Sequence, residues 1–236
     1  MIQKAFVLTA GLGERLKPLT LKTPKPMLPI GGKPLIDYVL RYLKKEGVQE
    51  VILNLFHLGD QIERYVGMGD KFGLVVHYSR EQTLLGTGGG LRQAAQWLER
   101  EKEFIVINGD TLIGASLKEL YASHQTLGAA ATLVLKKKNP DESYTPISCE
   151  DSKITAIGEP HGDYFYTGLM IATPKLIKKL PTGPSCLIRQ GIIPLLRNGA
   201  TIGGHLFDGF WCDIGTPERY QQIQEEWASN HLNNHL

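Results

Sequence analysis

Two cations and a glycine turn near the N-terminus have the types and spacing to bind phosphate. Arg15 and Lys25 follow a short apolar run that ends at Ala10-Gly11. A guanidinium offers a planar fork of hydrogen-bond donors and an ammonium offers a point charge, and both suit phosphate oxygens. Pro24 and Pro26 flank Lys25 and restrict the backbone around it, which lowers the entropy lost when the ammonium is held in place. We expect Arg15 and Lys25 to act on a polyphosphate.

The glycine turn matches neither of two common phosphate-binding loops. Gly11-Leu12-Gly13 lets the backbone approach a ligand and leaves N–H groups available for phosphate oxygens. A dinucleotide fingerprint needs glycine where Leu16 stands, and a P-loop needs Ser or Thr where Pro34 stands. The positioned cations therefore favour phosphate binding, whereas Lys17 and Lys22 are expected to be solvated charges.

Two aspartates stand at the ends of apolar segments. Asp110 follows the run 104–107, where a charge at the carboxyl end of a buried strand needs a partner or a metal. Asp213 follows another apolar segment and precedes a Gly-Thr-Pro turn. Two carboxylates suit Mg²⁺, which keeps waters and takes other ligands from substrate phosphate. Either aspartate alone would indicate an ordinary turn or capping residue.

Strand and helix patterns alternate over the first half of the chain, which predicts right-handed crossovers and a mostly parallel sheet covered on both faces. The predicted strands there are 4–9, 51–55, 74–78 and 104–107, and the predicted helices are 34–46, 60–66 and 88–98. Ligands of such a sheet bind outside the carboxyl ends of its strands. The less regular second half has predicted strands at 129–135, 154–157, 166–172, 201–207 and 210–213, and predicted helices at 185–197 and 217–227.

Composition limits the class of protein. The 236 residues carry a net charge of +2, so no global field indicates binding to nucleic acid or a membrane surface. Three cysteines without CxxC spacing predict a reducing compartment and no structural zinc. The chain lacks an apolar run of about 18 residues, and its N-terminal run is too short for a signal peptide. We expect a cytoplasmic protein.

Four motifs spread along the chain share one family resemblance. They are Gly11-x-Gly13-x-Arg15-x-x-Pro18-x-Thr20 with Pro24-Lys25-Pro26-Met27-Leu28-Pro29, Leu85-Gly86-Thr87-Gly88-Gly89, Val106-Ile107-Asn108-Gly109-Asp110, and Trp211-Cys212-Asp213-Ile214-Gly215-Thr216-Pro217. Together they resemble the signature of the sugar-1-phosphate nucleotidylyltransferases, from residue 2 to about 227. The resemblance implies a three-layer, Rossmann-like (glycosyltransferase-A-like) α/β fold with a mixed, mostly parallel sheet. It implies one domain over 1–236, with a nucleotide-binding part to about 128, a sugar-binding part over about 129–227 and a tail over 228–236.

The resemblance also implies a reaction and its partners. A nucleotidyl group passes from an NTP (UTP or GTP) to a sugar 1-phosphate, giving an NDP-sugar and pyrophosphate. The sugar phosphate oxygen is already an anion, so catalysis needs in-line positioning and charge neutralisation rather than a protein base. Asp110 and Asp213 would hold Mg²⁺, Arg15 would hold the departing pyrophosphate, and Lys25 would neutralise charge at the α-phosphorus. No nucleic acid or membrane partner is implied, and the protein is expected to be a monomer or a homodimer.

The resemblance implies two further sets of contacts, one to the nucleotide and one to the sugar. Glu81 would pair with the N1 and N2 donors of guanine, whereas the amide of Gln82 could serve a pyrimidine, so the base stays open. The nucleotide set is Ala10, Gly11, Gly13, Glu81, Gln82, Gly86, Thr87 and Gly88. The sugar set is Asn108, Glu159, Thr167 and Gly168. Many relatives carry Glu-Lys-Pro, with the lysine on the sugar phosphate, but this chain reads Gly158-Glu159-Pro160 and lacks that lysine.

Several substrates fit the resemblance. The short chain and the TGGG loop are most similar to the N-acetylmuramate-1-phosphate uridylyltransferases of cell-wall recycling, and nearly as similar to mannose- and mannoheptose-1-phosphate guanylyltransferases. A phosphocholine cytidylyltransferase would surround a quaternary ammonium with aromatic and acidic residues, for which Asp163 and 164–166 are candidates. A non-catalytic nucleotide-sugar-binding relative is the last alternative, and the presence of both cations and both aspartates argues against it.

Overall fold

The computed structural model describes residues 2–139 and 143–229, so positions 230–236 of the predicted tail lie outside the described residues. The chain divides into two compact units, which we describe separately. Unit 1 holds Leu85–Ile107 and Ala115–Asp208, and unit 2 holds Gln3–Leu84, Asn108–Gly114 and the chain from Gly209 on. None of the described helices is long and apolar enough to cross a membrane.

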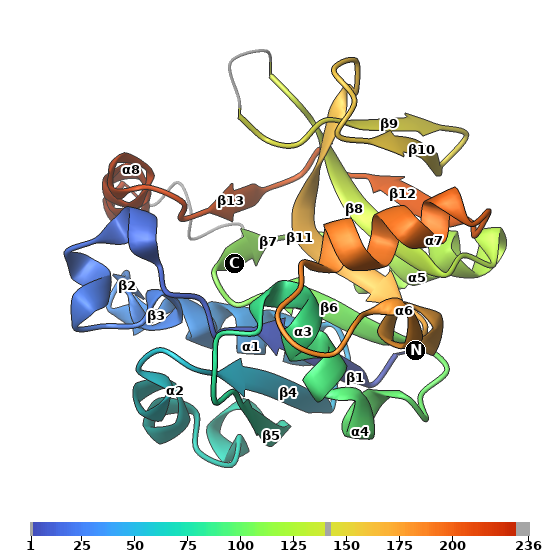
Figure 1. Ribbon diagram of the computed structural model, residues 1–236. Coiled ribbons are helices and arrows are strands. Elements are labelled where there is room, and N and C mark those ends of the chain that lie inside the picture. The colour runs from blue at the N-terminus through green and yellow to red at the C-terminus, as the bar shows by residue number, and fades with distance from the viewer. Residues whose placement is uncertain (1, 140–142, 230–236) are drawn as a thin grey trace. The chain divides into compact units, whose positions relative to one another are not determined.

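Unit 2 is built on three parallel strands formed by the apolar runs of the first half (Figure 1). Strand β4 (Glu50–Leu55) pairs with β1 (Lys4–Leu8) on one side and with β5 (Val75–Arg80) on the other. Helices α1 (Leu35–Lys45) and α2 (Gly59–Val66) provide the crossovers. The interiors of β1 and β4 are buried, as continuous apolar runs in parallel sheets require, whereas β5 is partly exposed.

Two small ladders complete unit 2. Strand β2 (Pro29–Ile30) pairs with β3 (Lys33–Pro34), and β7 (Thr111–Ile113) pairs antiparallel with β13 (Trp211–Asp213). Helix α8 (Pro217–Ala228) begins at Thr216, whose hydroxyl accepts a hydrogen bond from the backbone N–H of Arg219 at 3.3 Å. A buried apolar cluster joins these pieces: Leu16, Leu28, Ile30, Leu35, Tyr38, Leu112, Cys212, Ile214 and Ile223.

The described residues of unit 1 form six strands in the order β6-β11-β8-β12-β10-β9. They are β6 (Phe104–Asn108, its last residue in unit 2), β11 (Tyr164–Ala172), β8 (Ala131–Lys137), β12 (Ile202–Leu206), β10 (Lys153–Ile157) and β9 (Ile147–Glu150). Strands β8 and β12 pair in parallel, and the other pairs are antiparallel. The predicted α/β class with a mixed sheet is confirmed.

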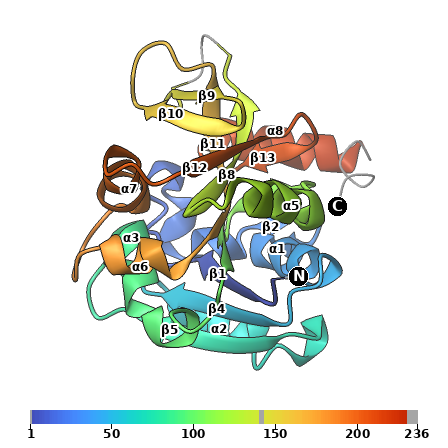
Figure 2. The same cartoon turned by 90° about the vertical axis from the view of Figure 1, so that its right-hand side faces the viewer.

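The helices of unit 1 lie on both sides of its strands. Figure 2 shows α5 (Leu117–Leu127) on one side of β8, with α6 (Pro174–Lys179) and α7 (Ile193–Arg197) on the other. Helices α3 (Gly86–Gln93) and α4 (Ala95–Leu98) precede β6. The predicted helix over 185–197 is a π-helical segment, Leu187–Ile192, followed by α7. Pro194 lacks an N–H for the regular ladder, and Gly191 lets the backbone pack against Leu176, since a Cβ there would lie 2.8 Å from its Cδ1.

Candidate active site

The loop that follows β1 folds back on itself in three short 3₁₀ turns, Glu14–Leu16, Leu19–Leu21 and Lys25–Met27. Gly13 has φ of 64°, and a Cβ there would lie 2.6 Å from Thr20 Cγ2. The Thr20 hydroxyl donates to the Gly13 carbonyl at 2.8 Å. Glycine is needed at this position because any side chain would meet Thr20 and would have to adopt a left-handed backbone.

Helix α2 and the residues before it anchor the outer part of this loop. The ring Nε2 of His57 lies 2.7 Å from the Thr20 carbonyl oxygen. The Gln61 amide donates to the Lys22 carbonyl at 2.8 Å. These bonds hold the backbone and leave the Lys22 side chain exposed, which agrees with its predicted role as a solvated charge.

Lys25 and Asp110 form an ion pair in unit 2. Their side chains keep only 15% and 22% of their exposure, so both charges are largely withdrawn from water. Asp110 follows Gly109, whose N–H donates to the Leu8 carbonyl at 2.9 Å. A Cβ on Gly109 would lie 2.9 Å from that same carbonyl oxygen and 2.6 Å from Thr9 Cγ2, so glycine brings the Asp110 backbone against the end of β1. The predicted need of Asp110 for a partner is met by Lys25.

The β7–β13 ladder brings Asp213, the second predicted metal ligand, beside the segment that carries Asp110. Asp213 is opposite Thr111, the residue that follows Asp110. A Cβ on Gly215 would lie 3.3 Å from Asp213 Oδ2 and 3.4 Å from Arg15 Nη2, so the carboxylate and the guanidinium both face this glycine.

A cavity of about 400 Å³ in unit 2 collects the predicted catalytic residues. Its lining is Gly11, Leu12, Gly13, Glu14, Arg15, Leu16, Lys25, Leu84, Asp110 and Gly215. Both predicted cations, both glycines of the turn and one predicted metal ligand therefore share one cavity, with Asp213 beside the Gly215 wall. Buried Ala10 precedes the lining and does not form part of it.

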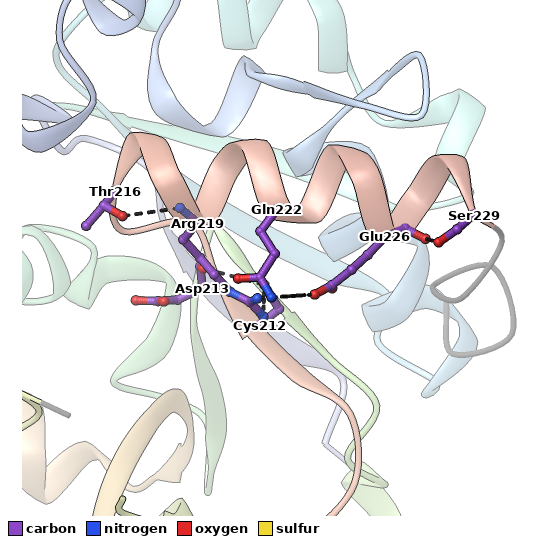
Figure 3. Close-up of polar contacts among 7 residues, drawn as sticks. All are labelled: Cys212, Asp213, Thr216, Arg219, Gln222, Glu226 and Ser229. Atoms are coloured by element: carbon purple, nitrogen blue, oxygen red, sulfur yellow. Dashed lines mark hydrogen bonds and ion pairs between the residues drawn. The ribbon is translucent and has the colours of Figure 1, made fainter. Parts of the chain in front are cut away.

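Helix α8 braces the strand that carries Asp213 (Figure 3). The Arg219 guanidinium lies 3.4 Å from Cys212 Sγ and 3.5 Å from Glu226 Oε1. Cys212 is 1% exposed, and burial raises the pKa of its thiol to about 12. This cysteine is therefore a packing residue rather than a nucleophile.

A buried polar network links the end of β1 to the predicted base reader. The Thr9 N–H donates to Asn54 Oδ1 at 2.8 Å, and the Thr9 hydroxyl donates to the Asn54 carbonyl. The Asn54 amide donates to Glu81 Oε1 at 2.7 Å. The three residues are 1%, 2% and 7% exposed. Glu81 is thus a held, buried carboxylate, whereas the neighbouring Gln82 is exposed.

The predicted Gly86-Thr87-Gly88 loop lies in unit 1, where it packs against residues 185–187. Gly86 has φ of 67°, and a Cβ there would lie 2.7 Å from the Ser185 carbonyl oxygen, which also accepts the Gly88 N–H at 2.9 Å. The Thr87 hydroxyl accepts a hydrogen bond from the Leu187 N–H at 2.9 Å. These contacts explain the glycines by packing, and nucleotide binding by this loop stays a prediction.

Two of the predicted sugar residues, Thr167 and Gly168, lie in strand β11. Thr167 is buried and donates to the Val134 carbonyl at 2.9 Å, and Gly168 has φ of 93°. Glu159 is exposed, and Asn108 is half-buried at the end of β6. A cavity of about 450 Å³ in unit 1 is lined by Gly158 and by Arg189, a cation that the sequence patterns did not single out.

The residues present fit the predicted magnesium ion by the chemistry of their donors. Within 2–139 and 143–229, no group of three or more His, Cys, Asp or Glu side chains is placed to hold a metal. Asp110 and Asp213 would supply two carboxylate oxygens, and Mg²⁺ usually takes one or two carboxylates together with waters and substrate phosphate.

Comparisons with known proteins identify the relatives of this chain. The family model for nucleotidyl transferases matches residues 4–230. The D-glycero-alpha-D-manno-heptose 1-phosphate guanylyltransferase of Aneurinibacillus thermoaerophilus is 32% identical, over 94% of this chain and 97% of that protein. The N-acetylmuramate alpha-1-phosphate uridylyltransferase of Neisseria meningitidis serogroup B is also 32% identical, over 94% of this chain and 96% of that protein. The structure of HddC from Yersinia pseudotuberculosis complexed with GMP-PN has a TM-score of 0.81 at 27% identity, covering 96% of this chain and 100% of that chain.

Proposed function

The chain belongs to the nucleotidyl transferase family, as its motifs predicted, and from that premise we propose which residues carry the reaction. The activity is transfer of a nucleotidyl group to a sugar 1-phosphate. The observation that carries the residue assignment is the Lys25–Asp110 ion pair, which lies in the same cavity as Arg15 and the glycine turn.

The two cations bind different phosphates of the nucleotide. Lys25 binds the α-phosphate and neutralises the charge that grows there as the sugar phosphate oxygen attacks. Arg15 binds the β- and γ-phosphates and holds the pyrophosphate as it leaves, aided by the N–H groups of Gly11-Leu12-Gly13. The nucleophile is already an anion, so no side chain has to remove a proton and catalysis rests on in-line positioning.

Asp110 and Asp213 hold Mg²⁺ in this proposal. A bound ion, held by these two carboxylates, would supply charge neutralisation to the phosphate oxygens. Asp110 also pairs with Lys25, which lines the same cavity, so the cation and the carboxylate position each other.

The buried Glu81 favours guanine as the base of the donor. Guanine presents two adjacent donors, N1–H and N2–H, which match the two oxygens of a carboxylate. Uracil presents one N–H between two carbonyl oxygens, and these oxygens would face the carboxylate unfavourably. Since the Asn54 amide fixes Glu81, the carboxylate is preorganised for guanine. GTP is therefore the proposed donor.

Uridylyl transfer to N-acetylmuramate 1-phosphate is the second candidate. Gln82 follows Glu81 directly, and its side chain is exposed. Its amide can therefore accept from the N–H of uracil and donate to a neighbouring carbonyl oxygen of the base. This arrangement would leave Glu81 with a purely structural task, which is to hold the end of β5 through Asn54.

A release assay for pyrophosphate tests the proposal. The four NTPs are combined with muramate, mannose, mannoheptose and choline phosphates, with and without Mg²⁺. We expect release that depends on Mg²⁺ and is fastest with GTP. Release with none of the pairs would contradict the assigned activity and favour a non-catalytic binding protein.

The variant Glu81→Gln distinguishes GTP from UTP as the nucleotidyl donor. The glutamine keeps an oxygen that accepts the Asn54 amide, so the loop stays anchored while guanine loses one acceptor. We expect the kcat/KM for GTP to fall roughly ten- to a hundredfold relative to that for UTP, the range for a charged hydrogen bond. Gln82→Ala is the matched control, and a change of the GTP-to-UTP ratio in that variant alone would favour the second candidate.

A further inference from the structure

Unit 1 contains a cavity whose lining combines aromatic rings, isoleucines and one cation. It measures about 450 Å³, which suits a monosaccharide with a substituent. The rings of Tyr144 and Phe165 stack at its wall with centroids 4.3 Å apart and an interplanar angle of 15°. A flat aromatic wall packs well against the C–H face of a sugar or an alkyl substituent.

Tyr166, one of the residues that line this cavity, has a buried hydroxyl without a hydrogen-bond partner among the described residues. Burial raises the pKa of Tyr166, so the hydroxyl stays neutral and can donate. A buried hydroxyl without a partner is unfavourable, and the positions of such groups call for a specific explanation. An oxygen of a bound ligand would supply the missing acceptor.

Arg189 is the only charged side chain in the cavity lining of the described residues. It lies in the π-helical segment Leu187–Ile192, which is fixed at its start by the Gln190 side chain accepting the Cys186 N–H at 2.7 Å. Isolated π-turns occur often at functional sites. None of the described residues forms an ion pair with Arg189, so its guanidinium is available to an anion.

We propose that this cavity binds the sugar of the acceptor and that Arg189 selects acceptors that carry a carboxylate in addition to their 1-phosphate. The proposal rests on the proposed function and names the class of acceptor for it. One planar fork of donors matches one carboxylate in a bidentate pair. The Tyr166 hydroxyl donates to a sugar or substituent oxygen, and the isoleucine side chains cover its alkyl part.

The same lining argues against choline phosphate as the acceptor. A quaternary ammonium would need acidic neighbours around an aromatic wall. The described lining contains no Asp or Glu, and its one charge, on Arg189, would repel the ammonium. Asp163, the acid that the sequence offered for this role, does not line the cavity.

A matched pair of acceptors tests the proposal. N-acetylmuramate 1-phosphate and N-acetylglucosamine 1-phosphate differ only in the lactyl ether, and hence in one carboxylate. Turnover is measured for both with GTP and with UTP, and direct binding of each acceptor is measured by calorimetry. We expect the wild-type protein to bind the muramate compound more tightly, and Arg189→Gln to weaken that binding roughly ten- to a hundredfold without affecting the glucosamine compound.

Three variants complete the design. Arg189→Lys keeps the charge but loses the bidentate fork, so it should restore part of the preference. Tyr166→Phe should weaken both acceptors, since it removes a donor to the ligand without removing the charge. Arg197→Gln is the control, because Arg197 is an exposed arginine of the adjacent α7 and lies outside the cavity lining.

Two outcomes would overturn the inference. Equal loss of both acceptors in Arg189→Gln would mean that Arg189 binds the 1-phosphate that they share. Equal binding of both acceptors to the wild-type protein would mean that the carboxylate is not recognised. Absent turnover combined with carboxylate-dependent binding would overturn the proposed function and leave the acceptor assignment standing, so the two failures are distinguishable.

Discussion

Replacing Lys25 by alanine removes the cation that we place on the α-phosphate. Its side chain is 15% exposed and its partner Asp110 is 22% exposed, so the ammonium lies in a site from which water is largely excluded. Fixed donors in such a site stabilise the transition state far more than surface charges do. Loss of one preorganised donor typically lowers kcat by about 10² to 10³, or about 2.7 to 4 kcal/mol of barrier. We expect a loss in this range for Lys25→Ala.

The assay is release of pyrophosphate at saturating nucleotide and acceptor, with Mg²⁺ present. Lys22→Ala is the matched control because Lys22 belongs to the same loop, is exposed, and is held through its carbonyl rather than its ammonium. Exposed charges of this kind contribute about 0 to 1 kcal/mol, so this variant should remain within a few-fold of the wild type. Lys25→Arg keeps the charge in a different geometry and should fall between the two.

A folded Lys25→Ala protein with kcat within about threefold of the wild type would refute the reasoning. Lys25 would then serve only as a counter-ion for Asp110, and the loss would appear as a lower melting temperature rather than a lower rate. Comparison of thermal unfolding with turnover separates the two roles.

Three further predictions concern packing and titration. Gly109→Ala should lower stability by roughly 1 to 3 kcal/mol and also reduce turnover, since its Cβ would lie 2.9 Å from the Leu8 carbonyl oxygen; chemical denaturation and the release assay measure both. Burial lowers the pKa of His124 from 6.5, so the unfolded state takes up this proton first; the unfolding free energy should fall as pH drops below about 6.5, and less so in His124→Gln. Cys212, whose pKa burial raises to about 12, should resist alkylation at pH 8 in the native protein, whereas half-exposed Cys186 should react; mass spectrometry of the labelled peptides decides.

Much of the fold was predictable because its strands are continuous apolar runs and its helices carry one apolar face. Helix α5 was nevertheless missed, although its boundaries are marked in the sequence. Ser116 caps it by accepting the Glu119 N–H at 3.3 Å, and Gly128 ends it with φ of 55°. The combination of serine, glutamate three residues later and a closing glycine is a known capping signal. The caps, more than the hydrophobic periodicity, mark this helix in the sequence.

The cavity of unit 2 and the cavity of unit 1 differ in how far sequence patterns reveal their lining residues. Arg15, Lys25 and Asp110 can be singled out from their sequence neighbours. Glycine lies near Arg15, prolines flank Lys25, and an apolar strand ends just before Asp110. Each of these neighbours restricts the backbone that carries the side chain. Arg189 does not stand out, since an arginine within a helical pattern is usually a solvated residue. Only the topology of unit 1 brings it to the cavity wall shared with Tyr144 and residues 165–166, more than twenty positions away in the chain.

Asn54 is a polar residue within the apolar run of β4, and it connects the two parts of the proposed donor site. A buried amide must find partners, and this one binds Thr9 on one side and Glu81 on the other. Thr9 leads into the glycine turn that lines the phosphate cavity, while Glu81 is the proposed base reader. The spacing between the proposed phosphate and base contacts is therefore set by one buried side chain of a strand, Asn54, rather than by the loops themselves.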